Sequence, residues 1–163
     1  MHKSAGNDNF KNEINRSGGD TAFNRNHYLI TELPSTFQDI ESAGIRVDST
    51  MGFPESIGFR NSYGFPIRPF NLKDSRPYTF VEVPLTIMDT TLKFYQKNNS
   101  RQAEIIILDF LNKNKENAVI TILWHNNYFF DYADKGWLTC YKNILRYLIE
   151  QDFERFDVGQ NIQ

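Results

Sequence analysis

The fold class is decided by the stretch Ala118-Val119-Ile120-Thr121-Ile122-Leu123-Trp124-His125. Residues 119–124 form a near-continuous apolar run that is rich in β-branched side chains. A run of this length and composition is typical of a strand that helices cover on both faces, as in a parallel sheet. We therefore expect a buried strand over residues 118–125.

Helices and strands alternate along the rest of the chain. We expect strands at residues 45–48 and 78–85, a β-leaning segment at 25–30, and helices at 35–43, 90–95, 100–115 and 137–153. Alternation of strands and helices is the order of an α/β protein with a mostly parallel sheet. This is the fold class that the sequence predicts.

Local signals predict the ends and the buried faces of the longer helices. Ser35 and Gln38 have the spacing of a capping box at the start of the first helix, and Gly44 is placed to end it. Helical spacing predicts these inward-facing residues: Phe37, Ile40 and Ala43 in the first helix, Ile105, Leu108 and Leu111 in the helix at 100–115, and Trp137, Tyr141, Leu145 and Leu148 in the last. Each helix is therefore expected to bury one face.

Composition and charge exclude several classes of protein. Of the 163 residues, 40% are hydrophobic, 15% aromatic and 23% charged, as in an ordinary globular domain. The formal charge of -2 provides no basic field for nucleic acid, so no nucleic-acid partner is expected. Every apolar run is far below the roughly 20 residues that cross a bilayer, so no membrane partner is expected either.

The cysteine content and the first residues bear on compartment. Cys140 is the single cysteine, which excludes an intramolecular disulfide, and its place in the last helix predicts an inert core residue. Residues 1–24 are rich in Asn, Gly and Ser, and we expect a poorly structured or remnant segment there. The first nine residues lack the apolar core of a signal peptide, which predicts a cytoplasmic protein.

A long loop follows the strand expected at 45–48. Residues 49–75 hold many Gly, Pro and aromatic residues without helical or strand periodicity. Loops of this length in compact domains are usually functional or disordered, and the aromatic residues argue against disorder. The aromatic residues are Phe53, Phe59, Tyr63, Phe65 and Phe70, with Tyr78 and Phe80 at the flank. We expect a binding loop over residues 53–80.

Polar side chains mark the ends of the expected strands. They are Arg25 and His27 beside the first, Asp48 after the second, Asp89 past the third, and His125 and Asn126 after the fourth. Ligands of parallel α/β sheets and barrels bind at the carboxyl ends of the strands, so we expect these residues to form a site. A histidine there, oriented by an aspartate, is a candidate general acid or base.

Each of these residues also has a structural interpretation. His125 could be a strand-end histidine that a backbone group satisfies, and Arg25 could be an ordinary surface charge. Asp48 and Asp89 could be helix caps or turn residues, as most loop aspartates are. The aromatic residues of the loop could pack within the protein and offer no surface to a sugar. The residue types alone leave these alternatives open.

Six segments, taken in order, resemble the later part of NodB-type polysaccharide deacetylases of the bacterial large-homologue subgroup. They are Arg25-Asn26-His27-Tyr28-Leu29, residues 43–53, Gly58-Phe59-Arg60, residues 69–72, residues 82–92 and Leu123-Trp124-His125-Asn126. The resemblance covers about residues 23–150, and its specificity lies in the ordered set of motifs. It implies a partial, distorted (β/α) barrel, whose C-terminal part would occupy residues 25–157, with a tail at 158–163.

The resemblance also implies an activity, the metal-dependent hydrolysis of N-acetyl amide bonds on a glycan. In that family an Asp and two His hold a divalent metal, zinc or a similar ion, and a second Asp acts as the base. A later His protonates the leaving amine. These residue types suit the reaction, because the metal lowers the pKa of its bound water and an amine leaves readily only when protonated.

Carried over by motif, the family's roles fall on specific residues. Arg25 and Tyr28 match the Arg-x-x-aromatic motif, in which the arginine steadies the base. His125 matches the late Leu-x-His motif as the general acid. Asp48 and Asp89 compete to orient it, and we prefer Asp89 because it directly follows the Glu-Val-Pro strand. Substrate contacts are expected from Tyr28, His27, Arg60, Trp124 and Asn126.

The chain departs from the family in its metal-binding motifs. The early Asp-Asp motif has no counterpart, and the His-x-x-x-His motif is represented at most by His2, which has Gly6 four residues on. Three protein ligands are the usual minimum for a catalytic zinc. We therefore expect a protein that is inactive or nearly so alone, with a complementing N-terminal half as one expected partner. The alternative is a non-catalytic domain that binds a carbohydrate or a protein partner through loop 53–80.

Overall fold

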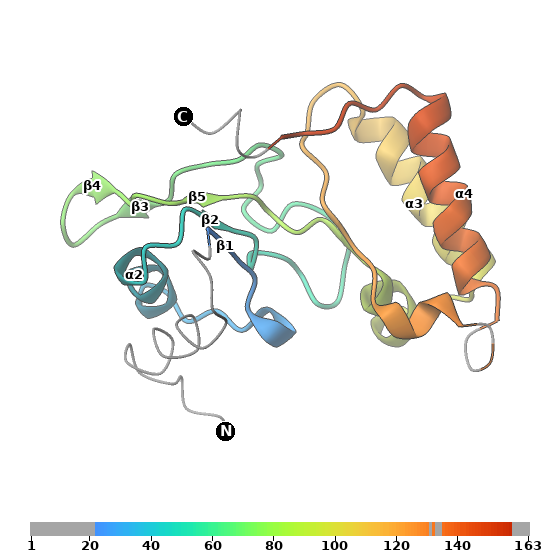
Figure 1. Cartoon of the computed structure of the whole chain (residues 1–163), viewed down its shortest axis with the longest axis horizontal. Coiled ribbons are helices and arrows are strands. Elements are labelled where there is room, and N and C mark those ends of the chain that lie inside the picture. The colour runs from blue at the N-terminus through green and yellow to red at the C-terminus, as the bar shows by residue number, and fades with distance from the viewer. Residues whose placement is uncertain (1–21, 131, 133–134, 158–163) are drawn as a thin grey trace. The chain divides into compact units, whose positions relative to one another are not determined.

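The computed structural model describes residues 22–130, 132 and 135–157 (Figure 1). The chain divides into two units, each with its own set of internal contacts. Unit 1 comprises residues 1–51 and 66–83, and unit 2 comprises residues 52–65 and 84–163. In the described part, no helix has both the length and the apolar character that crossing a membrane requires.

Unit 1 is built on a parallel sheet of three short strands. These are β1 (Phe23–Asn24), β2 (Val47–Asp48) and β5 (Val81–Glu82), in the order β1-β2-β5. The unit also contains the turn η1 (His27–Leu29), helix α2 (Ser35–Ser42) and the antiparallel pair β3 (Phe70–Asn71) and β4 (Arg76–Pro77). Its core consists of Phe37, Ile40, Ile45, Tyr78 and Phe80.

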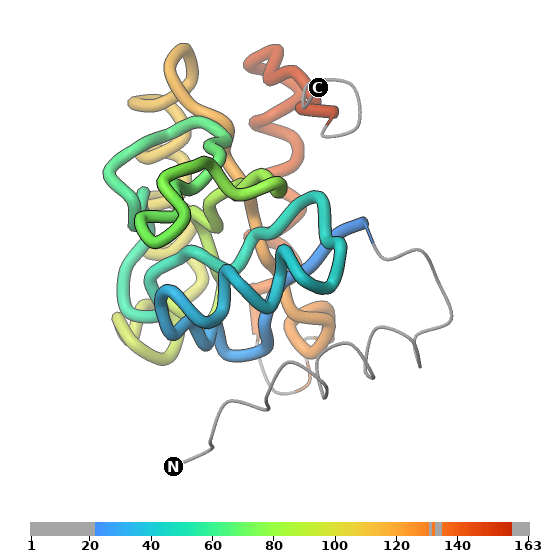
Figure 2. The backbone as a smooth tube through the Cα atoms, turned by 90° about the vertical axis from the view of Figure 1, so that its left-hand side faces the viewer, coloured from blue at the N-terminus to red at the C-terminus, as the bar shows by residue number. Residues whose placement is uncertain are grey.

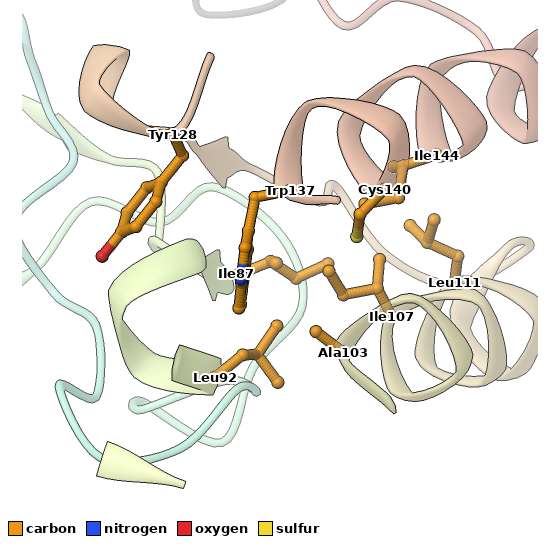
Figure 3. Packing of buried hydrophobic residues seen from close by; sticks show 9 residues of the cluster. All are labelled: Ile87, Leu92, Ala103, Ile107, Leu111, Tyr128, Trp137, Cys140 and Ile144. Carbon is orange, nitrogen blue, oxygen red and sulfur yellow. The ribbon is translucent and has the colours of Figure 1, made fainter. Parts of the chain in front are cut away.

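Unit 2 contains one parallel strand pair and the longer helices. Strand β6 (Ile87–Met88) pairs with β7 (Ile122–Leu123), and the remaining elements are η2 (Thr91–Tyr95), α3 (Ser100–Asn114), η3 (Asn126–Phe129) and α4 (Trp137–Glu150). Helices α3 and α4 pack against each other. Figure 3 shows the core that they enclose with Ile87, Leu92 and Tyr128.

The predicted fold class is confirmed in its mixture of helices and strands and in its mostly parallel strand pairing. The protein mixes helices and strands, and the pairs of the β1-β2-β5 sheet and of β6 with β7 are all parallel. The described strands form three separate small sheets and no closed barrel. Residues 49–69 contain no helix and no strand beyond an isolated bridge at Ile67, and their irregular path can be followed in Figure 2.

The predicted strands differ from the structure in extent or type. Those expected at 45–48 and 78–85 are reduced to β2 and β5. Residues 25–30 contain the turn η1 and no strand, because Tyr28 and Leu29 have the left-handed φ values of 58° and 54°, which an extended strand does not allow. The strand expected over 118–125 is reduced to β7, and its residues are half-buried. Because the side chains of Ile122 and Leu123 are only half-buried, β7 lacks the full cover on both faces that the apolar run predicted.

Helix boundaries are predicted well, whereas one predicted cap is wrong. Helix α2 begins after Pro34 without a side-chain cap, and the Ser35 hydroxyl donates instead to the carbonyl of Glu32. Gly44, with φ of 73°, follows the end of α2 as expected. A true capping box lies at the start of α3, where Asn99 and Gln102 bond each other's backbone N–H groups.

The buried faces of α3 and α4 differ in part from the prediction. Helix α3 buries Ala103, Ile107 and Leu111, while the expected Ile105 is 62% exposed. Helix α4 buries Trp137, Cys140 and Ile144, while the expected Leu145 is exposed. Both helices have more apolar residues than one face can hold, so spacing alone could not select the face. Cys140 is a core residue as predicted, and burial raises the pKa of its thiol to about 12.

The two isoleucines of α3 give a matched test of this packing. Ile107→Ala should lower the free energy of unfolding by about 2–5 kcal/mol, because it leaves a cavity between α3 and α4. Ile105→Ala removes the same atoms from an exposed site and should change it by less than about 0.5 kcal/mol. Urea unfolding followed by circular dichroism measures both. Equal losses in the two variants would contradict the assignment of the buried face.

Candidate functional site

Asp89 and His125 meet at the ends of two paired strands in unit 2. Strands β6 and β7 are parallel with Met88 opposite Leu123, so the residues that follow emerge at the same edge. His125 Nδ1 lies 2.6 Å from Asp89 Oδ1, and the backbone N–H of His125 donates to Asp89 Oδ2. Thr90 donates to Asp89 Oδ1 through both its backbone N–H and its hydroxyl. The Asp89 carboxylate is therefore fixed by four contacts.

The two partners differ in their access to solvent. Asp89 is completely buried, whereas the His125 side chain is 40% exposed. A buried carboxylate that accepts from Nδ1 fixes that nitrogen as the protonated one in the neutral ring. Nε2 is then the nitrogen that can accept or deliver a proton, and no described residue forms a hydrogen bond with it. The arrangement suits transfer of a proton to or from a bound molecule.

Other residues of unit 2 that the sequence did not single out surround this pair. The buried Tyr128 ring lies edge-on to the His125 ring, at 6.3 Å between centroids. The pKa of the Tyr128 hydroxyl is raised, mainly by burial. The ammonium of Lys93 lies 4.7 Å from the centre of the Tyr128 ring. The Thr90 hydroxyl is also 3.3 Å from His125 Nδ1. The Asp-Thr-Thr sequence at the strand end is the pattern from which Thr90 could have been identified, whereas no local sequence pattern indicated Tyr128.

Asp48 is the centre of a second polar group, which lies in unit 1. It is fully buried on β2. Its carboxylate accepts from Asn24 Nδ2 at 2.6 Å, from the Thr50 hydroxyl at 2.9 Å and from the Thr50 backbone N–H at 3.0 Å. Among the described residues, its hydrogen-bond partners are Asn24 and Thr50, and none is a histidine. Of the two competing aspartates, Asp89 is thus the one that contacts His125 in the structure.

Arg25 and Glu82 complete the polar group of unit 1. Arg25 donates from Nε to the backbone carbonyl of Ser49 and from its terminal nitrogen to the Ser49 hydroxyl, each at 2.9 Å. Glu82 on β5 is the register partner of Asp48 and is buried. Burial, followed by the charge of Asp48, raises the pKa of Glu82 to about 9. The sequence pattern that could have identified Glu82 is an acidic residue between two apolar residues, Val81 and Val83.

The residues predicted to contact substrate occupy different environments. In unit 1, Tyr28 is 79% exposed and stacks near His27, with ring centres 4.1 Å apart. In unit 2, Arg60 donates to the carbonyl of Gly52, and Asn126 is exposed at the start of η3. Trp124 packs against the rings of Trp137 and Tyr141. His2, the predicted metal ligand, lies outside the described residues.

The aromatic residues of loop 53–80 divide into core and surface groups. Tyr78 and Phe80 belong to the core of unit 1 and are unavailable to a ligand. Phe59 packs on Phe110 of α3. Tyr63 and Phe65 are exposed side by side, with ring centres 5.7 Å apart. Only part of the predicted binding loop can therefore offer aromatic surface to a partner.

The described residues do not fit the metal that the resemblance implies. Within 22–130, 132 and 135–157, no three His, Cys, Asp or Glu side chains come together as a metal site requires. The Asp89–His125 pair supplies two such groups, and the histidine nitrogen nearest the carboxylate is already engaged by it. The geometry of this pair suits proton transfer.

Comparison with known proteins adds no assignment. No protein-family model, curated protein or solved structure matches this chain.

The Asp89–His125 contact predicts the tautomer of the histidine ring. In mildly alkaline solution, the ¹⁵N shifts of His125 should show Nδ1 protonated and Nε2 bare, because the carboxylate accepts from Nδ1. Asp89→Asn should reduce this preference, since the amide is a weaker acceptor and can itself donate to Nδ1. Asp109→Asn, which changes an exposed aspartate of α3, should leave the ring shifts unchanged. Protonation of His125 at Nε2 in the unsubstituted protein would contradict this geometry.

Proposed function

We propose that this protein is a polysaccharide deacetylase-like protein that carries the amine-protonating part of the site, with His125 as the general acid. The observation that supports the proposal best is the contact between Asp89 and His125 at the carboxyl ends of two parallel strands. The sequence resemblance implies that His125 is the general acid, and Asp89 is the aspartate that we prefer over Asp48 as its orienting carboxylate. The finer fold proposed with it is the C-terminal part of a distorted (β/α) barrel.

The proposed step is delivery of a proton to the nitrogen of an N-acetylated sugar as its bond to the acetyl carbon breaks. His125 would donate from Nε2, the nitrogen that faces away from Asp89. An amine is a poor leaving group when it departs as an anion, so protonation of this nitrogen lowers the barrier. In deacetylases the divalent metal supplies the activated water, and the described residues offer no site for it.

Asp89 acts in this step by holding the ring. Its oxygens fix Nδ1 and the backbone N–H of His125, which sets the position of the imidazole along the strand end. Thr90 holds the Asp89 carboxylate through its backbone N–H and hydroxyl, so Thr90 also helps to fix the orientation of the pair.

Glycan binding at His125 tests the proposal without requiring turnover. Titration with N-acetylglucosamine oligomers should shift the ring resonances of His125. Asp89→Asn should weaken binding by up to about tenfold, because it releases the imidazole from its fixed orientation and so puts at risk the hydrogen bond between Nε2 and the sugar, worth roughly 1.4 kcal/mol. Asp109→Asn is the matched control and should bind as the unsubstituted protein does. Unshifted His125 resonances at saturating oligomer would overturn the proposal.

Measurement of acetate release distinguishes a chain that carries part of the catalytic site from a chain that carries all of it. We expect the chain, supplied with zinc and an N-acetylglucosamine oligomer, to release acetate no faster than a reaction without protein. Addition of a complementing N-terminal half would be required for turnover. Robust acetate release that disappears in His125→Ala would show that this chain carries the metal-binding half as well.

A second candidate function is a non-catalytic carbohydrate-binding domain. The exposed Tyr63 and Phe65 rings favour it, because sugars bind on exposed aromatic faces, and the nearby Arg60 could hold a hydroxyl. This candidate predicts glycan binding that survives both a chelator and His125→Ala but is weakened by Arg60→Ala. Titration calorimetry on these two variants, with and without chelator, distinguishes it from the first.

A further inference from the structure

Three polar residues lie side by side on the β1-β2-β5 sheet of unit 1. Asn24, Asp48 and Glu82 are register partners on three adjacent parallel strands. Asp48 is 0% and Glu82 is 1% exposed, so neither carboxyl group is solvated. Two neighbouring carboxyl groups that are shielded from water cannot both be ionised without a large cost in free energy, because each loses its hydration and the two charges repel each other.

The donors that surround Asp48 satisfy one carboxylate. Asp48 accepts three hydrogen bonds, one from Asn24 and two from Thr50. None of these donors also serves Glu82. The Asp48 carboxylate is therefore held as an acceptor by groups that stay neutral at every pH.

The donors that surround Glu82 are insufficient for a second carboxylate. Glu82 Oε1 accepts from the backbone N–H of Met51 at 2.9 Å. Glu82 Oε2 is buried, and no donor of the described residues reaches it. The charge of Arg25 acts on Glu82, but the Arg25 side chain donates its hydrogen bonds to Ser49. Asp48, the register partner of Glu82, is itself an acceptor, so Glu82 Oε2 is left without a hydrogen unless one of the two carboxyl groups is protonated.

We propose that Asp48 and Glu82 hold one proton between them, and that loss of this proton at alkaline pH opens the sheet at β2 and β5. With the proton in place, Glu82 donates from Oε2 to the Asp48 carboxylate, and the pair carries one negative charge. That charge matches the positive charge of Arg25, so the buried group is close to neutral. The shared proton satisfies the one buried oxygen that lacks a donor.

Removal of the proton places two negative charges on neighbouring strands. The titratable groups that face Glu82 are Asp48 from β2 and Arg25 from the segment after β1, and a single arginine cannot balance both charges. The repulsion acts across hydrogen bonds that join the segments of β2 and β5, among them those from Val81 N–H to Arg46 O and from Val83 N–H to Asp48 O. These bonds are the ones expected to open.

The direction of the pH effect follows from the pKa of Glu82. Burial first, and the charge of Asp48 second, raise this pKa from 4.5 to about 9. The folded protein therefore keeps the proton at pH values where the unfolded chain has lost it. The stability that the proton contributes is complete below about pH 4.5 and is lost as the pH rises towards 9, by up to about tenfold in the unfolding constant per pH unit.

Infrared spectroscopy detects the shared proton directly. At neutral pH the protein should show the C=O stretch of one protonated carboxyl group that exchanges slowly in D₂O, and this band should disappear on raising the pH. Glu82→Gln should lack the band at every pH above the ordinary carboxyl range. Absence of the band in the unsubstituted protein at neutral pH would overturn the proposal.

The pH dependence of urea unfolding supplies the second measurement. Glu82→Gln keeps the bond from Met51 through its amide oxygen and can donate to Asp48, so its stability should not share the decline between pH 4.5 and 9. Asp48→Asn should reduce the decline too, because it removes the neighbouring charge. Glu41→Gln is the matched control: Arg76 holds the pKa of Glu41 at about 2, so that substitution should leave the slope between pH 4.5 and 9 unchanged.

The outcomes separate the shared proton from a bound cation and from the proposed function. If Glu82→Gln fails to fold, the infrared band and the reduced slope in Asp48→Asn still decide the question. Stabilisation by added calcium or magnesium, together with a missing infrared band, would mean that a cation satisfies the pair and would overturn the proposal. Neither measurement involves a glycan, so failure here and failure of glycan binding at His125 are independent.

Discussion

A carboxylate that is buried at a strand end must be given hydrogen-bond donors or a proton, and this constraint organises both units of the protein. In unit 2, Asp89 obtains its donors from Thr90 and His125. In unit 1, Asp48 obtains them from Asn24 and Thr50. Parallel pairing makes both solutions possible, because it brings residues that are distant in the sequence to the same edge of a sheet.

The two solutions have different chemical consequences. Asp89 is satisfied by a histidine whose side chain is partly exposed, so the fixed carboxylate controls a nitrogen that a bound molecule can reach. Asp48 is satisfied by buried neutral groups and faces a second carboxyl group, so its charge stays within the core of its unit. Proton transfer to a substrate is therefore better supported at His125 than at Asp48, although the resemblance assigns roles to both.

The sequence predicted the positions of the helices better than it predicted which face of each helix is buried. Apolar runs and glycine positions are local signals, and they located α2, α3 and α4 to within a few residues. The faces depend on which surface each helix meets. Ile105 and Leu145 fit an amphipathic pattern as well as Ile107 and Ile144 do, and only the packing of α3 on α4 selects between them. The left-handed turn at Tyr28 was equally invisible, since no glycine marks it.

By itself, the sequence determined the alternation of strands and helices, the burial of Cys140, and a histidine, His125, soon after a strand, because all of these follow from residue type and local spacing. The strand that Asp89 follows, β6, lies beyond the strand expected at 78–85 and was not predicted. The tertiary structure decided which aspartate contacts His125 and paired Asp48 with Glu82. Those contacts join residues 36 and 34 positions apart, through strand register. Register is set by the hydrogen bonds and packing of whole strands, and no local pattern encodes it.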